Sequence, residues 1–402
     1  MARSRARRNA HWGWLLGMGG LMGLLLLGPH ASGQGLRING RVTDEATQEP
    51  LAYATVAIEG TSIGVVANGE GYFTLAVPEA HRQGALLVSF LGYGQQRYPL
   101  QGVADGVTFR LSSRGISTHE ISIEARVDTP LIERVVRKIE YNYPQVPTLL
   151  TGFYRNRLQL ESTDEDLQFS EAVLQMYKAA YQFSYDEDQV RLLKGRKGAD
   201  RYTVTSRDGK YRAELPHLVA GPQAGSKVDV AALRPPFLNL LTLDHYDYQV
   251  VAETVHEERP VYVVTYAPKD SANAEAHSAG TLYIDQATEA LVRAEFTTHP
   301  RRIEQSNRVK SELLTLRQHQ TVQYRRLGDT WYLHYVSAET EYRSRTTQQK
   351  LLLALEFLVT DIATDDIRPF KRKDILAESD VLTEYIGPVD TAFWESYNVI
   401  RN

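Results

Sequence analysis

Residues 60–64, GTSIG, have the G-x-S-x-G spacing of the nucleophile elbow of serine hydrolases. In that elbow a strand precedes the serine and a helix follows it, so that the hydroxyl stands at the mouth of an α/β sheet beside backbone donors for the oxyanion. Here Val65, Val66 and the turn-forming pair Asn68-Gly69 follow Ser62. This order favours a hairpin loop over a helix, and we therefore predict that Ser62 is not a nucleophile.

The eleven histidines include no pair with the spacing of metal ligands. His256 begins like a zincin helix, but no second histidine follows four residues later and Pro260 would end the helix. His245, His319 and His334 lie in strand-like segments, which favours sheet or core positions over metal ligation. Since the chain has no cysteine, thiolate sites and disulfides are excluded. We predict no metal site and no cofactor.

Three acidic clusters, at residues 164–166, 186–188 and 365–366, could bind Ca²⁺ or act as paired carboxylates. None of them has the alternating oxygen ligands, the fixed glycine and the distal glutamate of a calcium loop. We expect these residues in turns and on the surface. No catalytic residue is predicted from the sequence.

Tyrosine is the one abundant residue type with a functional interpretation, because 23 of the 402 residues are tyrosines. Ordinary strand propensity explains most of them. The alternative is an aromatic concave surface for a lipid, a glycan or a peptide, since tyrosine offers apolar area with a polar tip. The tyrosines on predicted strands are Tyr154, Tyr246, Tyr248, Tyr262, Tyr266, Tyr283, Tyr324, Tyr332 and Tyr335.

The elements that would position these residues begin with a β module at residues 35–112. Ala54, Val56 and Ile58 alternate with polar or small residues, a two-residue period typical of a half-buried strand. The NGEG stretch at 68–71 supplies positions where a positive φ costs little, which predicts a turn.

The order GRVTD, PLAYATVAIEGTSIG, NGEGYFTL and LLVSFLGYGQQRYPL resembles the carboxypeptidase regulatory-like domain. This resemblance implies a seven-stranded, transthyretin-like β-sandwich of the kind found at the N-terminus of outer-membrane receptors and envelope proteins of Bacteroidetes-type bacteria. The family has no catalytic residues to transfer to this chain.

Residues 113–148 are expected to link this module to a second domain. Ile121, Ile123 and Ala125 alternate, which predicts an extra strand near 119–126. After Thr129-Pro130, a favourable helix start, the apolar spacing changes to three and four residues and predicts a linking helix near 130–142.

From residue 149 to 402 the chain consists of long, tyrosine-rich alternating segments, which predict one large, curved antiparallel sheet with a few short helices. The fold class is therefore mainly β. Two segments remain ambiguous: 172–185 could be a helix or a strand, and 233–243 could be a short helix or a plug in a concave face. The predicted strands are 153–160, 246–251, 261–266, 281–285, 291–298, 312–324, 331–341 and 352–362.

The segments YDYQVVAETVHEERPVYVVTYAPK, AGTLYIDQATEALVRAEFTT and GDTWYLHYVSAETEY are similar to the half-open barrels of bacterial lipoprotein carriers, that is, to a LolA-like region. They are more closely similar to uncharacterised envelope proteins that also begin with a regulatory-like domain.

Residues 1–33 have the pattern of a secretory signal peptide: four arginines, an apolar run at 14–27 and small residues at 31–33. We expect cleavage before Gln34 and no transmembrane segment thereafter. Loss of the four arginines would take the formal net charge from −4 to −8, and the remaining basic residues are scattered, which argues against a nucleic-acid partner.

Three functions remain open at this stage. We favour a non-enzymatic protein of the periplasm or the periplasmic face of the outer membrane, in which the sandwich docks or spaces and the sheet binds an envelope protein, a glycan or a lipid. The first alternative is a carrier or chaperone for a lipid or another hydrophobic ligand. The second is an envelope hydrolase. The sequence does not predict the oligomeric state.

Overall fold

The computed structural model describes most of the chain beyond residue 35. The predicted signal peptide and most of the predicted strand at 119–126 lie outside the described residues. The described residues all belong to one compact unit. The described residues are 36–114, 126–127, 129–182, 187–200, 204–205, 212–213, 221–270, 276–298, 303, 313–377, 380 and 382–400.

Seven strands form the predicted N-terminal sandwich. One sheet has the order β4-β1-β7 and the other the order β3-β2-β5-β6; β1 runs antiparallel to β4 and parallel to β7. Alternating residues such as Val42, Phe73 and Phe109 are fully buried between them. The strands are β1 (Leu36–Asp44), β2 (Thr55–Ile58), β3 (Gly64–Val66), β4 (Tyr72–Val77), β5 (Ala85–Ser89), β6 (Gln96–Pro99) and β7 (Val107–Leu111), with the 3-10 helices η1 (Glu79–His81) and η2 (Leu100–Gly102).

The linking helix is confirmed as α1 (Thr129–Asn142). Its buried residues, Leu131, Ile132, Val135, Val136 and Ile139, have the three- and four-residue spacing of one helix face. They join the core that lies on one side of the large sheet.

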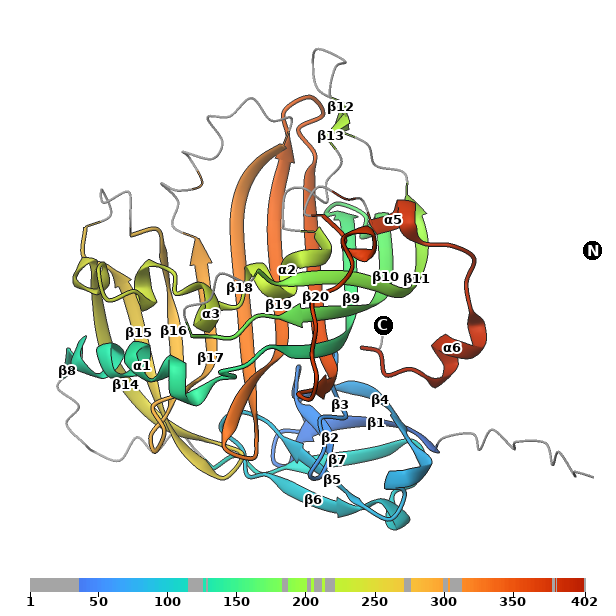
Figure 1. The fold of residues 1–402 in the computed structure, drawn as a ribbon, viewed down its shortest axis with the longest axis horizontal. Helices are drawn as coiled ribbons and strands as arrows, with labels where there is room; N and C mark the ends of the chain where they lie inside the picture. Colours follow the sequence, from blue (N-terminus) through green and yellow to red (C-terminus); the bar gives the residue numbers. More distant parts are fainter. Residues whose placement is uncertain are drawn as a thin grey trace, which may run out of the picture. The chain divides into compact units, whose positions relative to one another are not determined.

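Eleven antiparallel strands form the large sheet, in the order β11-β10-β9-β20-β19-β18-β17-β16-β15-β14-β8 (Figure 1). In the ambiguous segment 172–185, residues up to Lys178 are strand, because they continue β10. Another strand, β11, has no counterpart among the predicted strands. The strands are β8 (Arg126–Val127), β9 (Thr148–Leu160), β10 (Glu165–Lys178), β11 (Gln189–Asp200), β14 (Tyr246–His256), β15 (Arg259–Pro268), β16 (Ser278–Asp285), β17 (Leu291–Thr298), β18 (Leu313–Leu327), β19 (Thr330–Ser344) and β20 (Lys350–Ala363).

The two faces of this sheet pack against different parts of the protein. On β9, Tyr154 and Leu158 belong to the core that contains α1, whereas Phe153 belongs to the core of the sandwich. On β20, Phe357 and Leu358 divide in the same way. Since successive side chains of a strand point to opposite faces, the sheet lies between two hydrophobic cores.

The short helices are concentrated after β11. None of the helices in the described part of the chain is both long enough and apolar enough to cross a lipid bilayer. The remaining elements are β12 (Val204–Thr205), β13 (Arg212–Ala213), η4 (Gly221–Gln223), α2 (Ala224–Lys227), α3 (Val230–Leu233), η5 (Pro236–Leu238), η6 (Leu243–His245), η7 (Arg372–Asp374), α5 (Leu382–Tyr385) and α6 (Thr391–Ser396).

Candidate functional site

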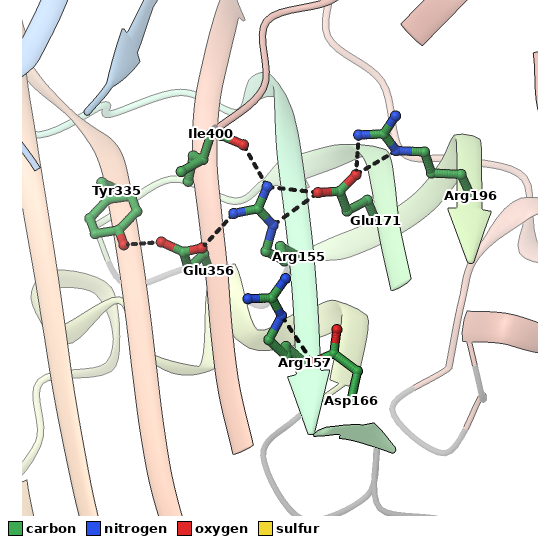
Figure 2. Close-up of polar contacts among 8 residues, drawn as sticks. All are labelled: Arg155, Arg157, Asp166, Glu171, Arg196, Tyr335, Glu356 and Ile400. Atoms are coloured by element: carbon green, nitrogen blue, oxygen red, sulfur yellow. Dashed lines mark hydrogen bonds and ion pairs between the residues drawn. The ribbon is translucent and has the colours of Figure 1, made fainter. Parts of the chain in front are cut away.

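A row of alternating charges crosses four neighbouring strands of the large sheet (Figure 2). Glu171 on β10 is paired with Arg196 on β11 and with Arg155 on β9, and Arg155 is in turn paired with Glu356 on β20. Paired residues on adjacent strands have neighbouring side chains on one face, so the strand register itself creates the row. We call these four residues the charge ladder.

Glu171 is the centre of the charge ladder and has no solvent exposure. Its Oε1 accepts hydrogen bonds from Nε and Nη2 of Arg155, at 2.9 and 2.7 Å, and its Oε2 contacts Arg196 at 2.5 Å. Nη1 of Arg155 lies 3.5 Å from Glu356, which also accepts a 2.8 Å hydrogen bond from Tyr335. Both carboxylates are therefore fully engaged by positive or donating groups.

The ladder also fixes the last described residues of the chain. Nη2 of Arg155 donates to the carbonyl oxygen of Ile400, and the adjacent Val399 forms a β-bridge with Thr74 of the sandwich. The side chain of Asn398 accepts a hydrogen bond from the backbone of Ala76. The C-terminal segment thus lies between the sandwich and the sheet, beside a cavity of about 280 Å³ that Arg155 and Glu356 line.

The ladder has the composition of an acid–base site, but its geometry is that of a structural ion network. Burial and the charge of Glu356 raise the pKa of Tyr335 well above its ordinary value, so its hydroxyl stays protonated. A general acid or base needs a free lone pair or proton directed at a substrate. Glu171 has none to offer, because Arg155 and Arg196 occupy both of its oxygens.

A second buried polar network lies on the opposite face of the sheet, around the fully buried Asp229. Its carboxylate accepts hydrogen bonds from Tyr181 at 2.6 Å and Tyr324 at 2.7 Å, and it lies 3.0 Å from Nζ of Lys178. Burial alone would lower the pKa of Lys178, but the charges of Asp229 and Asp188 raise it above its usual value. Because Asp229 also caps α3, the network fastens this helix to the sheet.

The residues that follow Asp229 fill the space in front of the sheet; we call residues 230–245 the plug segment. The ring of Phe237 stacks on Tyr266 with 4.5 Å between centroids and lies 5.4 Å from Phe296. The hydroxyl of Tyr248 donates to the carbonyl of Phe237 at 2.9 Å. Tyr246, Tyr248 and Tyr266 thus form an aromatic surface on this face, in line with the alternative considered for the tyrosines, whereas Tyr335 belongs to the sandwich core. The plug segment covers the aromatic surface.

A polar cavity of about 720 Å³ opens beside the plug segment. Its lining includes Lys178, Asp188 and Arg234 together with the apolar Leu233. Leu233 and Leu241 of the plug segment are 51% and 86% exposed. The surface of the plug segment thus presents leucines to solvent, while its interior is packed.

The elbow-like serine lies in a loop between two strands, as predicted. Ser62 follows β2 and precedes β3, and no helix starts after it. Its hydroxyl donates to Asp361 on β20 at 2.8 Å and accepts from the backbone N–H of Ile362. This contact docks the loop of the sandwich on the sheet.

The other sequence candidates are scattered. His319 and His334 lie in strands as predicted, but His245 ends a 3-10 helix, so the strand prediction was wrong there. In the described part of the chain, no group of three or more histidines and acids could hold a metal ion. Asp366 is an exposed partner of Arg368. Asp188, in contrast, pairs with the buried Lys178, a role that its acidic cluster did not suggest.

Sequence reasoning missed the charge ladder and the Asp229 network. The ladder residues are 16 to about 200 positions apart, and only the strand register brings them together. An alternation of charge with apolar residues in 153–160 was the one local signal, and it could not reveal the partners.

Part of the chain matches a known domain family. Residues 38–123 match the CarboxypepD_reg-like domain family, which confirms the predicted resemblance. A DUF1329 family protein from Desulfovibrio piger aligns over 62% of this chain and 99% of its own, with 10% identity and a TM-score of 0.26. A LolA superfamily protein from Nitrosomonas europaea aligns over 61% and 96%, with 13% identity and a TM-score of 0.21. No curated protein sequence matches significantly.

Proposed function

We propose that this chain is a non-enzymatic docking protein of the cell envelope, in which the sandwich and the large sheet act as one rigid body. The signal-like sequence at residues 1–33 supports a periplasmic location or one at the periplasmic face of the outer membrane. The observation that carries the proposal is the plug segment, because a filled concave face leaves the outer surfaces of the protein for binding.

Rigidity is supported by the contacts between the two parts. The backbone N–H of Gly92 donates to the carbonyl of Val255 at 2.8 Å, and Gln95 donates to the side chain of Glu258 at 2.7 Å. On another side of the interface, the rings of Tyr53 and Tyr335 lie 5.7 Å apart. Phe153, Val173 and Leu358 of the sheet also belong to the sandwich core, and a hydrophobic interface of this kind resists relative movement of the two parts.

The carrier function is the alternative that a specific observation favours. Leu233 lines the 720 Å³ cavity, and Leu240 and Leu241 of the plug segment are also exposed. A ligand could enter at the cavity if the plug segment moved. Movement would break the hydrogen bonds of Tyr181 and Tyr324 to Asp229. The docking proposal holds that this opening does not occur.

Lipid extraction followed by mass spectrometry separates the two functions. We expect the wild-type protein to carry no stoichiometric lipid and to give no saturable signal with the apolar dye 1-N-phenylnaphthylamine. Phe237→Ala should bind the dye, since it removes the ring that fills the concave face. Phe109→Ala, which empties a site in the sandwich core instead, is the matched control. A lipid bound one-to-one to the wild-type protein would refute the docking function and support the carrier function.

The hydrolase alternative has a separate test. A fluorophosphonate probe, which labels activated serines, should leave the protein unlabelled, because Ser62 is hydrogen-bonded to Asp361 and no histidine lies in the cavity beside it. Labelling that disappears in Ser62→Ala would establish a nucleophile and refute the non-enzymatic proposal.

A further inference from the structure

A pocket of about 460 Å³ opens where the sandwich meets the ends of two hairpins of the large sheet. The loop with Thr61 and Ser62 forms one wall, and Arg259, Arg325 and Arg326 belong to the other. Glu257 is the only acidic residue of the lining, so three positive side chains face one negative one. Two of these arginines pair with acidic residues outside the lining, Asp285 and Asp329, so the capacity of the pocket for an anion rests on Arg325.

The three arginines differ in how they are neutralised. Arg259 makes two contacts with Asp285, at 2.5 and 2.7 Å, and Arg326 lies 2.5 Å from Asp329. Arg325 is only 8% exposed, and its fully buried Nη1 has no hydrogen-bond partner in the described part of the chain. Glu257 of the same lining is the acidic neighbour of Arg325, but it does not hydrogen-bond Nη1, and a buried donor without a hydrogen-bond partner is costly in a folded protein.

A small cavity of about 20 Å³ is lined by the same arginine. Its lining includes His256 and His334, whose Nδ1 and Nε2 atoms are likewise buried without a hydrogen-bond partner among the described residues. This volume holds about one water molecule. Arg325 therefore lines both this small cavity and an open pocket that is large enough for a small molecule.

We propose that the open pocket binds a small oxyanion-bearing ligand, a phosphate ester or a carboxylate, whose anionic group accepts hydrogen bonds from Arg325. The planar guanidinium matches carboxylate and phosphate oxygens in bidentate geometry. Thr61 and Tyr332 line the same pocket and can contact the rest of a ligand.

The pocket lies at the junction between the sandwich and the large sheet. The ligand would contact the sandwich through Thr61 and the sheet through Arg325, so its binding energy would act across the junction between the two parts. The site lies on the face of the sheet opposite the plug segment, and its occupancy is therefore independent of whether the concave face takes up a ligand.

Isothermal titration calorimetry on the full mature chain tests the proposal, with inorganic phosphate, pyrophosphate and citrate as probes. At least one probe should bind saturably with one site per chain and raise the unfolding temperature beyond the effect of sodium chloride at equal ionic strength. Citrate and phosphate distinguish a carboxylate from a phosphate ligand. No saturable binding of any probe overturns the proposal.

Substitution of Arg325 locates the site. Arg325→Gln should weaken binding at least tenfold and Arg325→Lys less, whereas Arg110→Gln, which changes an exposed arginine of β7, should leave affinity unchanged. Unchanged affinity in Arg325→Gln overturns the assignment. If that variant does not fold, a tungstate soak of wild-type crystals decides the matter: an anomalous peak beside Arg325 supports the site, and its absence refutes it.

Discussion

Replacing Glu171 by alanine removes the carboxylate that holds two arginines of the charge ladder. Arg155 would keep its longer contact with Glu356 and its hydrogen bond to the carbonyl of Ile400. Arg196 is 34% exposed on its side chain and could turn to solvent. The cost of the substitution therefore falls mainly on Arg155, which is only 7% exposed.

The size of the effect follows from this burial. Removing one partner of a buried ion pair costs about 3–5 kcal/mol, because the remaining charge stays desolvated. An exposed ion pair contributes roughly 0–1 kcal/mol. Glu171 has no exposure, so we expect a loss of about 3–5 kcal/mol in the free energy of unfolding for Glu171→Ala.

Urea denaturation followed by circular dichroism and tryptophan fluorescence measures this loss. Glu161→Ala is the matched control, because Glu161 makes an exposed pair with Lys350 next to the same strands. The double variant Arg155→Met/Glu171→Leu should recover most of the stability, since no buried arginine is then left unpaired. Its free energy would differ from the sum of the single changes, as expected for contacting residues.

Two results would refute this reasoning. One is a loss below about 1 kcal/mol for Glu171→Ala, the range of a surface pair. The other is a double variant that is as unstable as the single one, since the cost would then come from lost packing of β10 and not from a stranded charge.

The remaining predictions concern pH and packing. Burial, with the nearby charge of Arg325, lowers the pKa of His334 to about 3. Between this value and about 6.5, the unfolded chain binds a proton that the folded chain does not. The free energy of unfolding should therefore fall as the pH drops from about 6.5 towards 3, by up to about 1.4 kcal/mol per pH unit. His334→Phe should flatten this part of a stability–pH curve, and an unchanged slope would contradict the assignment. A Cβ on Gly280 would lie 2.0 Å from the carbonyl oxygen of Glu295. Gly280→Ala should therefore lower the free energy of unfolding, measured by urea denaturation, by about 1–3 kcal/mol. The control Gly102→Ala, whose Cβ meets nothing within 4 Å, should be neutral, and equal effects of the two substitutions would refute the clash.

The parts of the fold that follow from local patterns were predictable. The alternation of apolar residues in the sandwich and in 246–362, and the helical spacing of 131–139, each report which face of an element is buried. The structure confirms these strands and α1, and the alternating burial of β14 and the single buried face of α1 account for the patterns there.

The parts that depend on neighbours were not predictable. β11 carries Lys194, Arg196 and Lys197 among few apolar residues, as an edge strand can, and its pattern resembles a loop. The pocket at Arg325 requires the docking of the sandwich loop on the hairpin ends, which no segment of the sequence encodes alone. Register and docking are set by long-range packing, and one sequence does not reveal them.

The pairing of β9 with β20 has a consequence for how the chain acquires its structure. Apart from the two-residue strand β8, which pairs with β14, the sheet consists of two runs of strands that follow one another along the chain, β9–β11 and β14–β20. Among the described residues, these runs pair with each other only where residues 148–160 meet residues 350–363. Because the chain is synthesised from its N-terminus, β9 lacks its second neighbouring strand, β20, until nearly the whole protein has been synthesised. Contacts of such high sequence separation slow folding and prolong the time during which a strand edge can aggregate. β9, an interior strand of the finished sheet, is therefore exposed as an edge for much of biogenesis.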